Sequence, residues 1–354
     1  MHLLNDIKKL RRMDPSEMIA RSTALPIQCL QGWEQGLAWA VPSGLKSARN
    51  LLVLGMGGSA IGGDFLQGVV RQQSARPIAV SRTYTIPAWV GPETLVLACS
   101  YSGNTEETLS AAQLAMRKGA KLAAITSCGE LVAVAAKNRF PLLRIPSGLP
   151  PRAALGYLAF APLGLVAQLG WVPRKSLPVE QACESLAHFI ATRLAPSVPA
   201  RSNPAKQLAE ALKDRLPVIY GAGGEWEAIA YRWRTQLEEN AKTLAFHHLF
   251  PEATHNEISG WLQPAALVKK MTALFLVDES MHPRVRRRMK FTEQIVRKQK
   301  AAVRVVQVPG DSILSRMLAM VSLGDFTSIY LAFLYGIDPT PVVRVEALKK
   351  YMKK

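Results

Sequence analysis

The sequence predicts an α/β protein with two mainly parallel sheets, each flanked by helices. Two observations predict this fold class. From residue 50 onward, short apolar segments alternate with helical patterns, as is typical of parallel sheets with helical crossovers. The alternation stops in a proline-rich stretch at residues 196–204 and then restarts. At 354 residues, the chain is long enough for two domains of ordinary size.

The first half divides into a helical segment and a first sheet domain. Residues 1–49 are expected to form helices packed on the core, with a helix start signal, Asp-Pro-Ser-Glu, at residues 14–17. Residues 50–170 are expected to form the first domain, and Gly-Leu-Pro-Pro at 148–151 precedes its last helix. The expected strands are 51–54, 77–81, 95–99, 122–126 and 142–145.

The second half is predicted to repeat this plan. Residues 171–204 are expected to form a helical linker, and residues 205–354 a second domain that ends in a helix at 341–352. The expected strands are 217–220, 244–247, 273–277 and 303–308, and the expected long helices are 225–242, 284–300 and 312–335. Each half opens on a strand, a glycine turn and a helix, which indicates an internal duplication.

The chain is strongly basic, with 44 Lys and Arg against 26 Asp and Glu and a formal net charge of +18. A basic protein attracts anions, including nucleic acids, acidic lipids and phosphorylated metabolites. The densest cluster of positive residues spans 284–300. We interpret it as the solvated face of a helix, because no zinc-finger, RNP-type or helix-turn-helix signature accompanies it. Nucleic acid is therefore not an expected partner.

Neither a membrane nor an oxidising compartment is predicted. No apolar run approaches about 18 residues without a charge, and the N-terminus lacks the order of a signal peptide. The four cysteines are Cys29, Cys99, Cys128 and Cys183; they form no CxxC pair. Cys99 and Cys128 are expected to be small core residues. These features predict a cytoplasmic protein.

Residues 100–108 read Ser-Tyr-Ser-Gly-Asn-Thr-Glu-Glu-Thr and lie between an expected strand and an expected helix at 106–118. A helix N-terminus presents unpaired N–H groups and a positive dipole end, so three nearby hydroxyls would complete a phosphate receptor. The alternative interpretation is an N-cap with a capping box at Thr105. Capping needs one hydroxyl and accounts for neither the other two nor Gly103, so we favour the anion site.

Residues 55–64 form a glycine-rich turn between a strand and a helix, which loosely resembles a dinucleotide-binding fingerprint. That fingerprint requires an acidic residue at the end of the next strand, where this chain has Arg82. An arginine there could accept a 2′-phosphate, so a site for NADP stays open as the less favoured interpretation. We favour a second wall of a sugar-phosphate pocket, because glycines let a ligand approach the backbone and Ser59 adds a donor.

Three further segments contain candidate catalytic residues. Arg152 lies at an expected helix start, where a cation opposes the helix dipole; this suggests either an anionic ligand or a structural ion pair. Glu238 and Glu239 point about 100° apart on a helix. An i,i+4 pair between Glu238 and Lys242 would leave Glu239 free. His255 lies in a polar loop, where a lone histidine is more often a surface residue.

Together these segments resemble the bifunctional phosphoglucose/phosphomannose isomerases of the sugar isomerase (SIS) superfamily. The serine loop marks the superfamily, and Glu-Asn-Ala-Lys and His-Asn-Glu narrow the resemblance to the isomerases. A closing segment at 336–349 also resembles the family's C-terminus, so the resemblance covers most of the chain. The matching segments follow the family's order and are residues 55–59, 100–108, 151–154, 239–242 and 255–257.

The resemblance implies two SIS domains, each a flavodoxin-like three-layer sandwich, in a homodimer with active sites at the interface. Glu239 would be the base, and Arg152 would stabilise an enediolate. His255, from the partner subunit, would assist ring opening together with Lys349, for which the adjoining Lys350 is the alternative. The residues that would hold the sugar phosphate are Gly57, Gly58, Ser59, Ser100, Ser102 and Thr105.

The implied reaction interconverts glucose 6-phosphate and mannose 6-phosphate with fructose 6-phosphate through a cis-enediolate. No cofactor is implied, and no His, Cys and carboxylate cluster with metal-ligand spacing predicts a metal. The chain departs from the family at Gly62, where alanine is usual, and in its more basic region 282–300. Two alternatives stay open: an aminosugar-phosphate isomerase on the same fold, and a sugar-phosphate-sensing regulator that binds nucleic acid.

Overall fold

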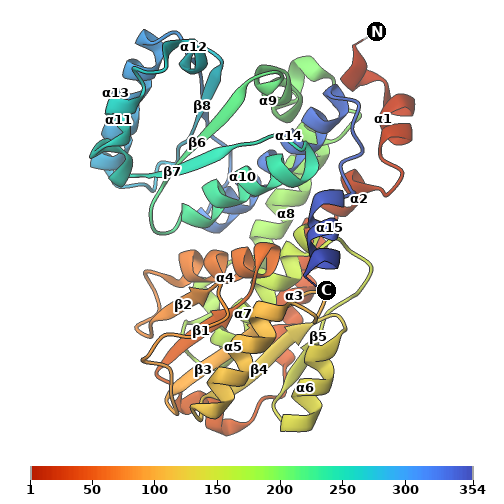
Figure 1. Cartoon of the computed structure of the whole chain (residues 1–354), viewed down its shortest axis with the longest axis vertical. Coiled ribbons are helices and arrows are strands. Elements are labelled where there is room, and N and C mark those ends of the chain that lie inside the picture. The colour runs from red at the N-terminus through yellow and green to blue at the C-terminus, as the bar shows by residue number, and fades with distance from the viewer. Residues whose placement is uncertain (1, 353–354) are drawn as a thin grey trace.

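The computed structural model describes residues 2–352 and contains two mainly parallel sheets with helices around them (Figure 1). This confirms the predicted fold class. The first sheet has the strand order β2-β1-β3-β4-β5. Its strands are β1 (Asn50–Leu54), β2 (Ile78–Ser81), β3 (Thr94–Cys99), β4 (Lys121–Thr126) and β5 (Leu142–Arg144). Every residue of β3 is buried, because helices cover both faces of the sheet.

The second sheet repeats this arrangement with the order β7-β6-β8-β9. Its strands are β6 (Leu216–Ala222), β7 (Phe246–Phe250), β8 (Met271–Leu276) and β9 (Ala302–Val306). In both sheets the first strand in the chain pairs with the next two, one on each side, all in parallel. Open α/β sheets bind ligands in the crevice at the carboxyl ends of the two adjacent strands where the strand order reverses, which is called the switch point. These strands are β1 and β3 in the first sheet and β6 and β8 in the second.

The helices follow the expected ranges closely, apart from their ends. They are α1 (Ile7–Met13), α2 (Met18–Thr23), α3 (Leu25–Ala38), α4 (Gly57–Val70), α5 (Glu106–Arg117), α6 (Glu130–Asn138), α7 (Leu155–Gln168), α8 (Val179–Phe189), α9 (Pro204–Leu212), α10 (Glu227–Asn240), α11 (Glu257–Gly260), α12 (Ala265–Val268), α13 (Pro283–Lys298), α14 (Ile313–Leu334) and α15 (Val343–Tyr351). The start signal at residues 14–17 acts through Asp14, whose carboxylate accepts from the amides of Met18 and Ile19.

A layer of helices joins the two sheets, which lie one above the other in Figure 1. Helix α7 packs on both α3 and α4, and α10 packs on both α4 and α14. Glycines bring α3 and α7 together: a Cβ at Gly36 would lie 2.2 Å from the carbonyl oxygen of Ala161. Gly62 on α4 is equally restricted, since its Cβ would lie 2.4 Å from the Leu158 oxygen. An alanine at 62 would therefore push α4 away from α7.

Helix α14 is the central element of the second domain. By length and composition it could cross a membrane, but 94% of its most apolar window is buried inside the protein. Its charged residues include Asp325, which is 5% exposed and lies opposite Arg232 on α10. We therefore interpret α14 as a core helix.

The proline-rich stretch between the domains is held in place by α9. Asn203 caps that helix by accepting from the amides of Ala205 and Lys206. The Lys206 ammonium donates to the carbonyls of Pro196 and Val198, both at 2.8 Å. Burial lowers the pKa of Lys206 to about 8. The stretch is thus a fixed connection between α8 and α9.

Two local expectations were wrong. The strand expected at 244–247 begins two residues later, at Phe246, because the chain leaves α10 through Lys242 in a left-handed conformation with φ of 55°. Cys128 is exposed, not a core residue, because it lies in the turn after β4. The other cysteines are free and buried, and burial raises the pKa of Cys99 to about 12.

Candidate active site

The serine and threonine loop follows β3 at the β1/β3 switch point, and its hydroxyls do not cap α5. Thr105 occupies the N-cap position, but its hydroxyl pairs with that of Ser100 at 2.8 Å. Within residues 2–352, no side chain caps this helix. The capping-box interpretation is therefore wrong, and the first-turn amides of α5 lack the side-chain acceptor that it would supply.

Gly103 has a structural explanation that the sequence analysis missed. Its φ is +68°, and a Cβ at this position would lie 1.7 Å from the carbonyl oxygen of Cys128. Asn104 fastens the same loop, because its side chain accepts from the amide of Glu130 at 2.8 Å and so caps α6. Ser102 accepts from the Asn104 amide at 3.3 Å. The loop is thus held by β4 and α6 rather than by its own hydroxyls alone.

The glycine turn after β1 lies against this loop. The Ser59 hydroxyl, 4% exposed as a residue, accepts from the amide of Tyr101 at 3.2 Å. Gly57 has φ of +50°, and a Cβ on Gly58 would lie 2.9 Å from the Pro151 oxygen and 3.3 Å from the Arg152 Cα. Glycine at 58 is therefore needed so that the turn can touch the segment that carries Arg152.

Arg152 lies in a short 3-10 helix, Pro151–Ala153, and is 4% exposed. Its Nε donates to the Asn240 side chain at 2.7 Å, and its Nη2 donates to the carbonyls of Pro339 and Thr340 at 2.8 Å each. A guanidinium has five N–H groups, and these bonds use three of them. The Nη1 side is left, and it lies 3.3 Å from the Glu239 carboxylate.

Glu239 lies in the last turn of α10 with its side chain 35% exposed. The neighbouring Glu238 pairs with Arg234 at 3.9 Å, so the expected pair between Glu238 and Lys242 is wrong. Lys242 lies beyond the helix end and donates instead to the carbonyls of Glu239 and Pro339, at 2.7 and 3.1 Å. Glu239 is left facing the Arg152 guanidinium, as a proton acceptor beside a fixed cation would be.

A buried ion pair beneath Arg152 was missed at the sequence level. Arg232 donates through Nε and Nη2 to both carboxylate oxygens of Asp325, at 2.9 and 2.7 Å. Its Nη2 also donates to the main-chain oxygen of Arg152 at 3.0 Å. Asn240 continues this network, donating to the Ser328 hydroxyl at 2.9 Å. The main chain of Arg152 is therefore supported by α10 and α14.

His255 and Lys349 are not joined to this group by any interaction within the described part of the chain. His255 is exposed and ends the 3-10 helix Glu252–Thr254. Lys349 is exposed on α15, a helix without buried residues that lies at the level between the two sheets in Figure 1. Lys350, the alternative to Lys349, is exposed on the same helix.

The corresponding switch point of the second sheet, between β6 and β8, is filled by side chains. Arg316 donates to the Asp278 carboxylate at 2.7 Å, and Asp278 in turn accepts from the Ser280 hydroxyl. The indole of Trp226 donates to Ser280 at 3.3 Å. The arginine bonds lower the pKa of Asp278 despite its burial. Among residues 2–352, the serine and threonine loop of the first half has no counterpart in this packed arrangement.

Arg82 is engaged by the protein itself, which argues against the dinucleotide interpretation. Its guanidinium pairs with the Asp64 carboxylate on α4 and lies 5.3 Å from the centre of the Tyr231 ring on α10. Burial raises the pKa of Asp64 to about 6, although Arg82 opposes the shift. Arg82 is thus an ion-pair partner at the junction between the domains.

Replacing Arg82 by alanine is expected to lower the free energy of unfolding by about 2 kcal/mol at pH 8, because the Asp64 carboxylate loses its charged partner. The folded pKa of Asp64, about 6, lies above its ordinary value of 3.8. The Asp64 carboxyl is therefore protonated as pH falls through 6, and a neutral carboxyl no longer needs a charged partner. The loss in the free energy of unfolding caused by Arg82→Ala should thus be smaller at pH 5 than at pH 8. Urea unfolding at both pH values measures this, with Arg49→Ala, from an exposed pair with Glu93, as the control. An equal loss at both pH values would contradict it.

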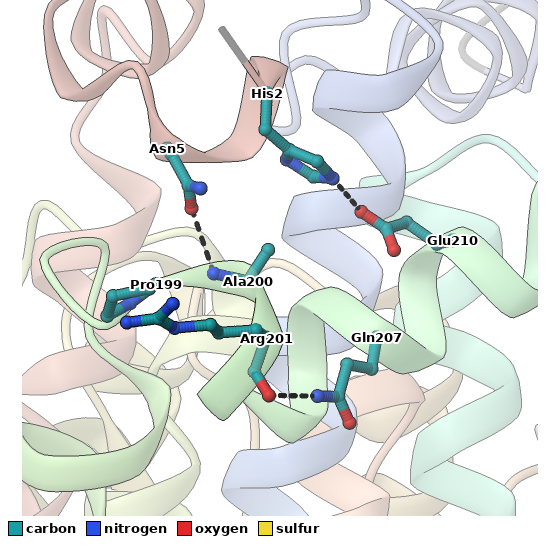
Figure 2. Close-up of a pocket in the computed structure, with 7 residues that line it drawn as sticks. All are labelled: His2, Asn5, Pro199, Ala200, Arg201, Gln207 and Glu210. Carbon is teal, nitrogen blue, oxygen red and sulfur yellow. Dashed lines mark hydrogen bonds and ion pairs between the residues drawn. The ribbon is translucent and has the colours of Figure 1, made fainter.

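A separate cavity of about 430 Å³ lies between the N-terminal segment and α9, and none of the candidate site residues lines it (Figure 2). Figure 2 shows His2 pointing to Glu210 and Asn5 to the amide of Ala200. The residues that line this cavity are His2, Asn5, Pro199, Ala200, Arg201, Gln207 and Glu210. They bring together no nucleophile with a base and no group of metal ligands.

Comparison with known proteins identifies the family. Residues 201–352 match the bacterial phospho-glucose isomerase C-terminal SIS domain, and residues 44–138 match the SIS domain. A bifunctional phosphoglucose/phosphomannose isomerase from Caldicellulosiruptor bescii is 41% identical over 325 residues, 92% of this chain and 96% of its own. The chain belongs to this isomerase family. A member from Aquifex aeolicus is 34% identical over 92% of this chain and 97% of its own.

A relative with another activity is also similar. A D-glucosamine-6-phosphate 4-epimerase from Sulfolobus acidocaldarius is 30% identical over 64% of this chain and 68% of its own. Among solved structures, a hypothetical protein from Thermus thermophilus has a TM-score of 0.73 at 15% identity and covers 98% of this chain and 94% of its own. A glucose-6-phosphate isomerase like protein from the same organism has a TM-score of 0.60 at 21% identity, over 96% and 98%. These structures support the fold.

Proposed function

We propose that the protein interconverts glucose 6-phosphate and mannose 6-phosphate with fructose 6-phosphate. One observation carries the proposal: the Glu239 carboxylate lies 3.3 Å from a buried Arg152, whose Cα packs against the glycine turn beside the serine loop. A base, a fixed cation and an anion receptor are thus connected parts of one structure. These are the groups that an aldose–ketose isomerisation of a phosphorylated sugar requires.

The phosphate would bind at the β1/β3 switch point. Ser59, Ser100, Ser102 and Thr105 supply hydroxyls there, beside the N-termini of α4 and α5. Backbone amides and the helix dipoles favour a dianion at this place. Binding the 6-phosphate would leave the opposite end of an open-chain sugar, C1 and C2, free to reach toward Glu239.

The proton transfer would then proceed through an enediolate. Glu239 would take the proton from C2 of the aldose and return it to C1, or the reverse from the ketose. Arg152 would stabilise the negative oxygen through Nη1, since its other N–H groups on Nε and Nη2 are held by the protein. Rotation of the enediolate in its pocket would let both C2 epimers form.

We further propose a homodimer in which His255 of one subunit and Lys349 of α15 assist ring opening at the shared site. The exposure of both residues supports this, because each is available to a second chain. The apolar side chains exposed on α15, Val343, Leu348 and Tyr351, also support it. The free, mostly buried cysteines support a cytoplasmic enzyme.

An aminosugar phosphate is the second candidate substrate, and the similarity to the glucosamine-6-phosphate epimerase favours keeping it. Product analysis distinguishes the two. We expect fructose 6-phosphate to yield both glucose 6-phosphate and mannose 6-phosphate, separated by chromatography, and glucosamine 6-phosphate to be left unchanged. Turnover of glucosamine 6-phosphate without turnover of fructose 6-phosphate would overturn the proposed function.

A further inference from the structure

Lys242 has a backbone conformation that lysine disfavours. It follows α10 directly after the C-cap Ala241 and has φ of +55°. Helices commonly place glycine at this position, because a Cβ strains the left-handed conformation. Strain of this kind persists where the surrounding structure enforces it, often at functional sites. The side chain of Lys242 is therefore the part of the residue that needs an explanation.

The side chain folds back across the end of α10. Its ammonium donates to the carbonyls of Glu239 at 2.7 Å, Asn240 at 3.3 Å and Pro339 at 3.1 Å. These three bonds match the three N–H groups of an ammonium. A cation on the terminal carbonyls of a helix is also favoured by the helix dipole. Lys242 thus ties the last turn of α10 to the turn that leads from α14 to α15.

The same Pro339 carbonyl accepts a bond from Nη2 of Arg152 at 2.8 Å. Lys242 and Arg152 therefore share one acceptor, and the position of that carbonyl sets the position of the guanidinium. The other end of the same tie is the main chain of Glu239. A movement of residues 336–342 would shift Arg152 and Glu239 relative to each other.

We infer that Lys242 is a positioning residue for the isomerisation: it holds the turn that supports Arg152 against the helix end that carries Glu239. This inference rests on the proposed function of those two residues. Lys242 touches neither substrate nor proton in this role. Lys242 would act by fixing the distance between the base and the cation. Displacements of about 1 Å between such groups can change rates by about 100-fold.

The charges around Lys242 make this role sensitive to pH. Burial, and to a smaller extent the charge of Arg152 on the Pro151–Ala153 segment, lower the pKa of Lys242 to about 8. Asp338 of the turn and Glu239 of α10 oppose the shift. Since the ammonium loses its proton as pH rises through 8, the tie should weaken on the alkaline side.

The test is the kinetics of Lys242→Met and Lys242→Gly with fructose 6-phosphate. We expect both to lower kcat by about 10- to 100-fold, with KM changed by less than about twofold. We expect the kcat of the wild type to fall above pH 8 and this fall to be absent from both variants. Lys242→Gly relieves the left-handed strain, so it separates loss of the tie from loss of folding.

Lys118→Met is the matched control. Lys118 is the C-cap residue of α5 and donates to the carbonyls of Pro87 and Ala88, at 3.5 and 3.1 Å. It stands one position earlier at the end of its helix than Lys242 does, and it also donates to main-chain carbonyls of a loop, but it has no bond to Arg152 or Glu239. We expect wild-type kinetics from it. A loss of kcat equal to that of Lys242→Gly would overturn the inference.

A second readout does not depend on activity. Amide hydrogen exchange at residues 336–342 should be faster in Lys242→Gly than in the wild type and unchanged in Lys118→Met. Unchanged exchange and an unchanged kcat in Lys242→Gly would overturn the inference. If the wild type lacks isomerase activity while the exchange result holds, the proposed function fails and the tie itself stands.

Discussion

Replacing Glu239 by glutamine is expected to lower kcat for fructose 6-phosphate by about 100- to 10,000-fold, because the amide cannot accept the proton from carbon. The KM should change by less than about twofold, since the loops proposed to bind the phosphate lie in the other domain and are untouched. Glutamine keeps the size of the side chain and can still accept from Arg152, so the 3.3 Å contact has a replacement. Steady-state kinetics with a coupled assay for glucose 6-phosphate measures both constants.

Glu238→Gln is the control for this change. Glu238 is the neighbouring carboxylate on α10, and it pairs with Arg234 at 3.9 Å on another side of the helix. Its replacement removes the same charge from the same helix turn, so we expect kcat to stay within about twofold of the wild type. Near-normal turnover by Glu239→Gln, or an equal loss in both variants, would remove Glu239 from the role of base.

The second large effect concerns stability. Replacing Asp325 by alanine is expected to lower the free energy of unfolding by about 3–5 kcal/mol, because it leaves the Arg232 guanidinium buried without its partner. Both residues are at most 5% exposed, and two hydrogen bonds of 2.9 and 2.7 Å join them. The variant should also lose activity, since Arg232 supports the main chain of Arg152.

Urea unfolding followed by tryptophan fluorescence measures this change. The control is Glu293→Ala, which removes the carboxylate of an i,i+4 pair with Arg297 on the surface of α13. Because the Arg297 side chain is 53% exposed, we expect a loss below about 1 kcal/mol. A loss below about 1 kcal/mol from Asp325→Ala would contradict the prediction, because it would mean that water or another group compensates the charge of Arg232.

The strands were predictable because each is a short apolar run bounded by turn residues, and such runs form strands wherever helices can cover both faces. The start of β7 could not be predicted in this way, because the chain passes through the left-handed Lys242 and the strand begins two residues later than expected. Propensity rules assign glycine, not lysine, to that conformation. The left-handed residue has a contact that the sequence pattern does not contain, the bond from its ammonium to the Pro339 carbonyl.

The candidate site could be assembled from motifs, but its connections could not. Arg152 and Glu239 were both singled out, yet they lie 87 residues apart and only the fold brings them to 3.3 Å. The Arg232–Asp325 pair was missed because each residue stands in an otherwise unremarkable helix. Only the packing of α10 on α14 gives either a partner. The need for glycine at position 103 was missed for the same reason, since the carbonyl oxygen that excludes a Cβ there belongs to Cys128.

The measurement that tests the central claim most directly is ¹H NMR of the products formed from fructose 6-phosphate in D₂O. Transfer through a carboxylate base exposes the moving proton to solvent. We therefore expect glucose 6-phosphate and mannose 6-phosphate that both carry deuterium at C2, and neither product from Glu239→Gln on the same timescale. Products that carry only hydrogen at C2, or no aldose phosphate at all, would contradict the account.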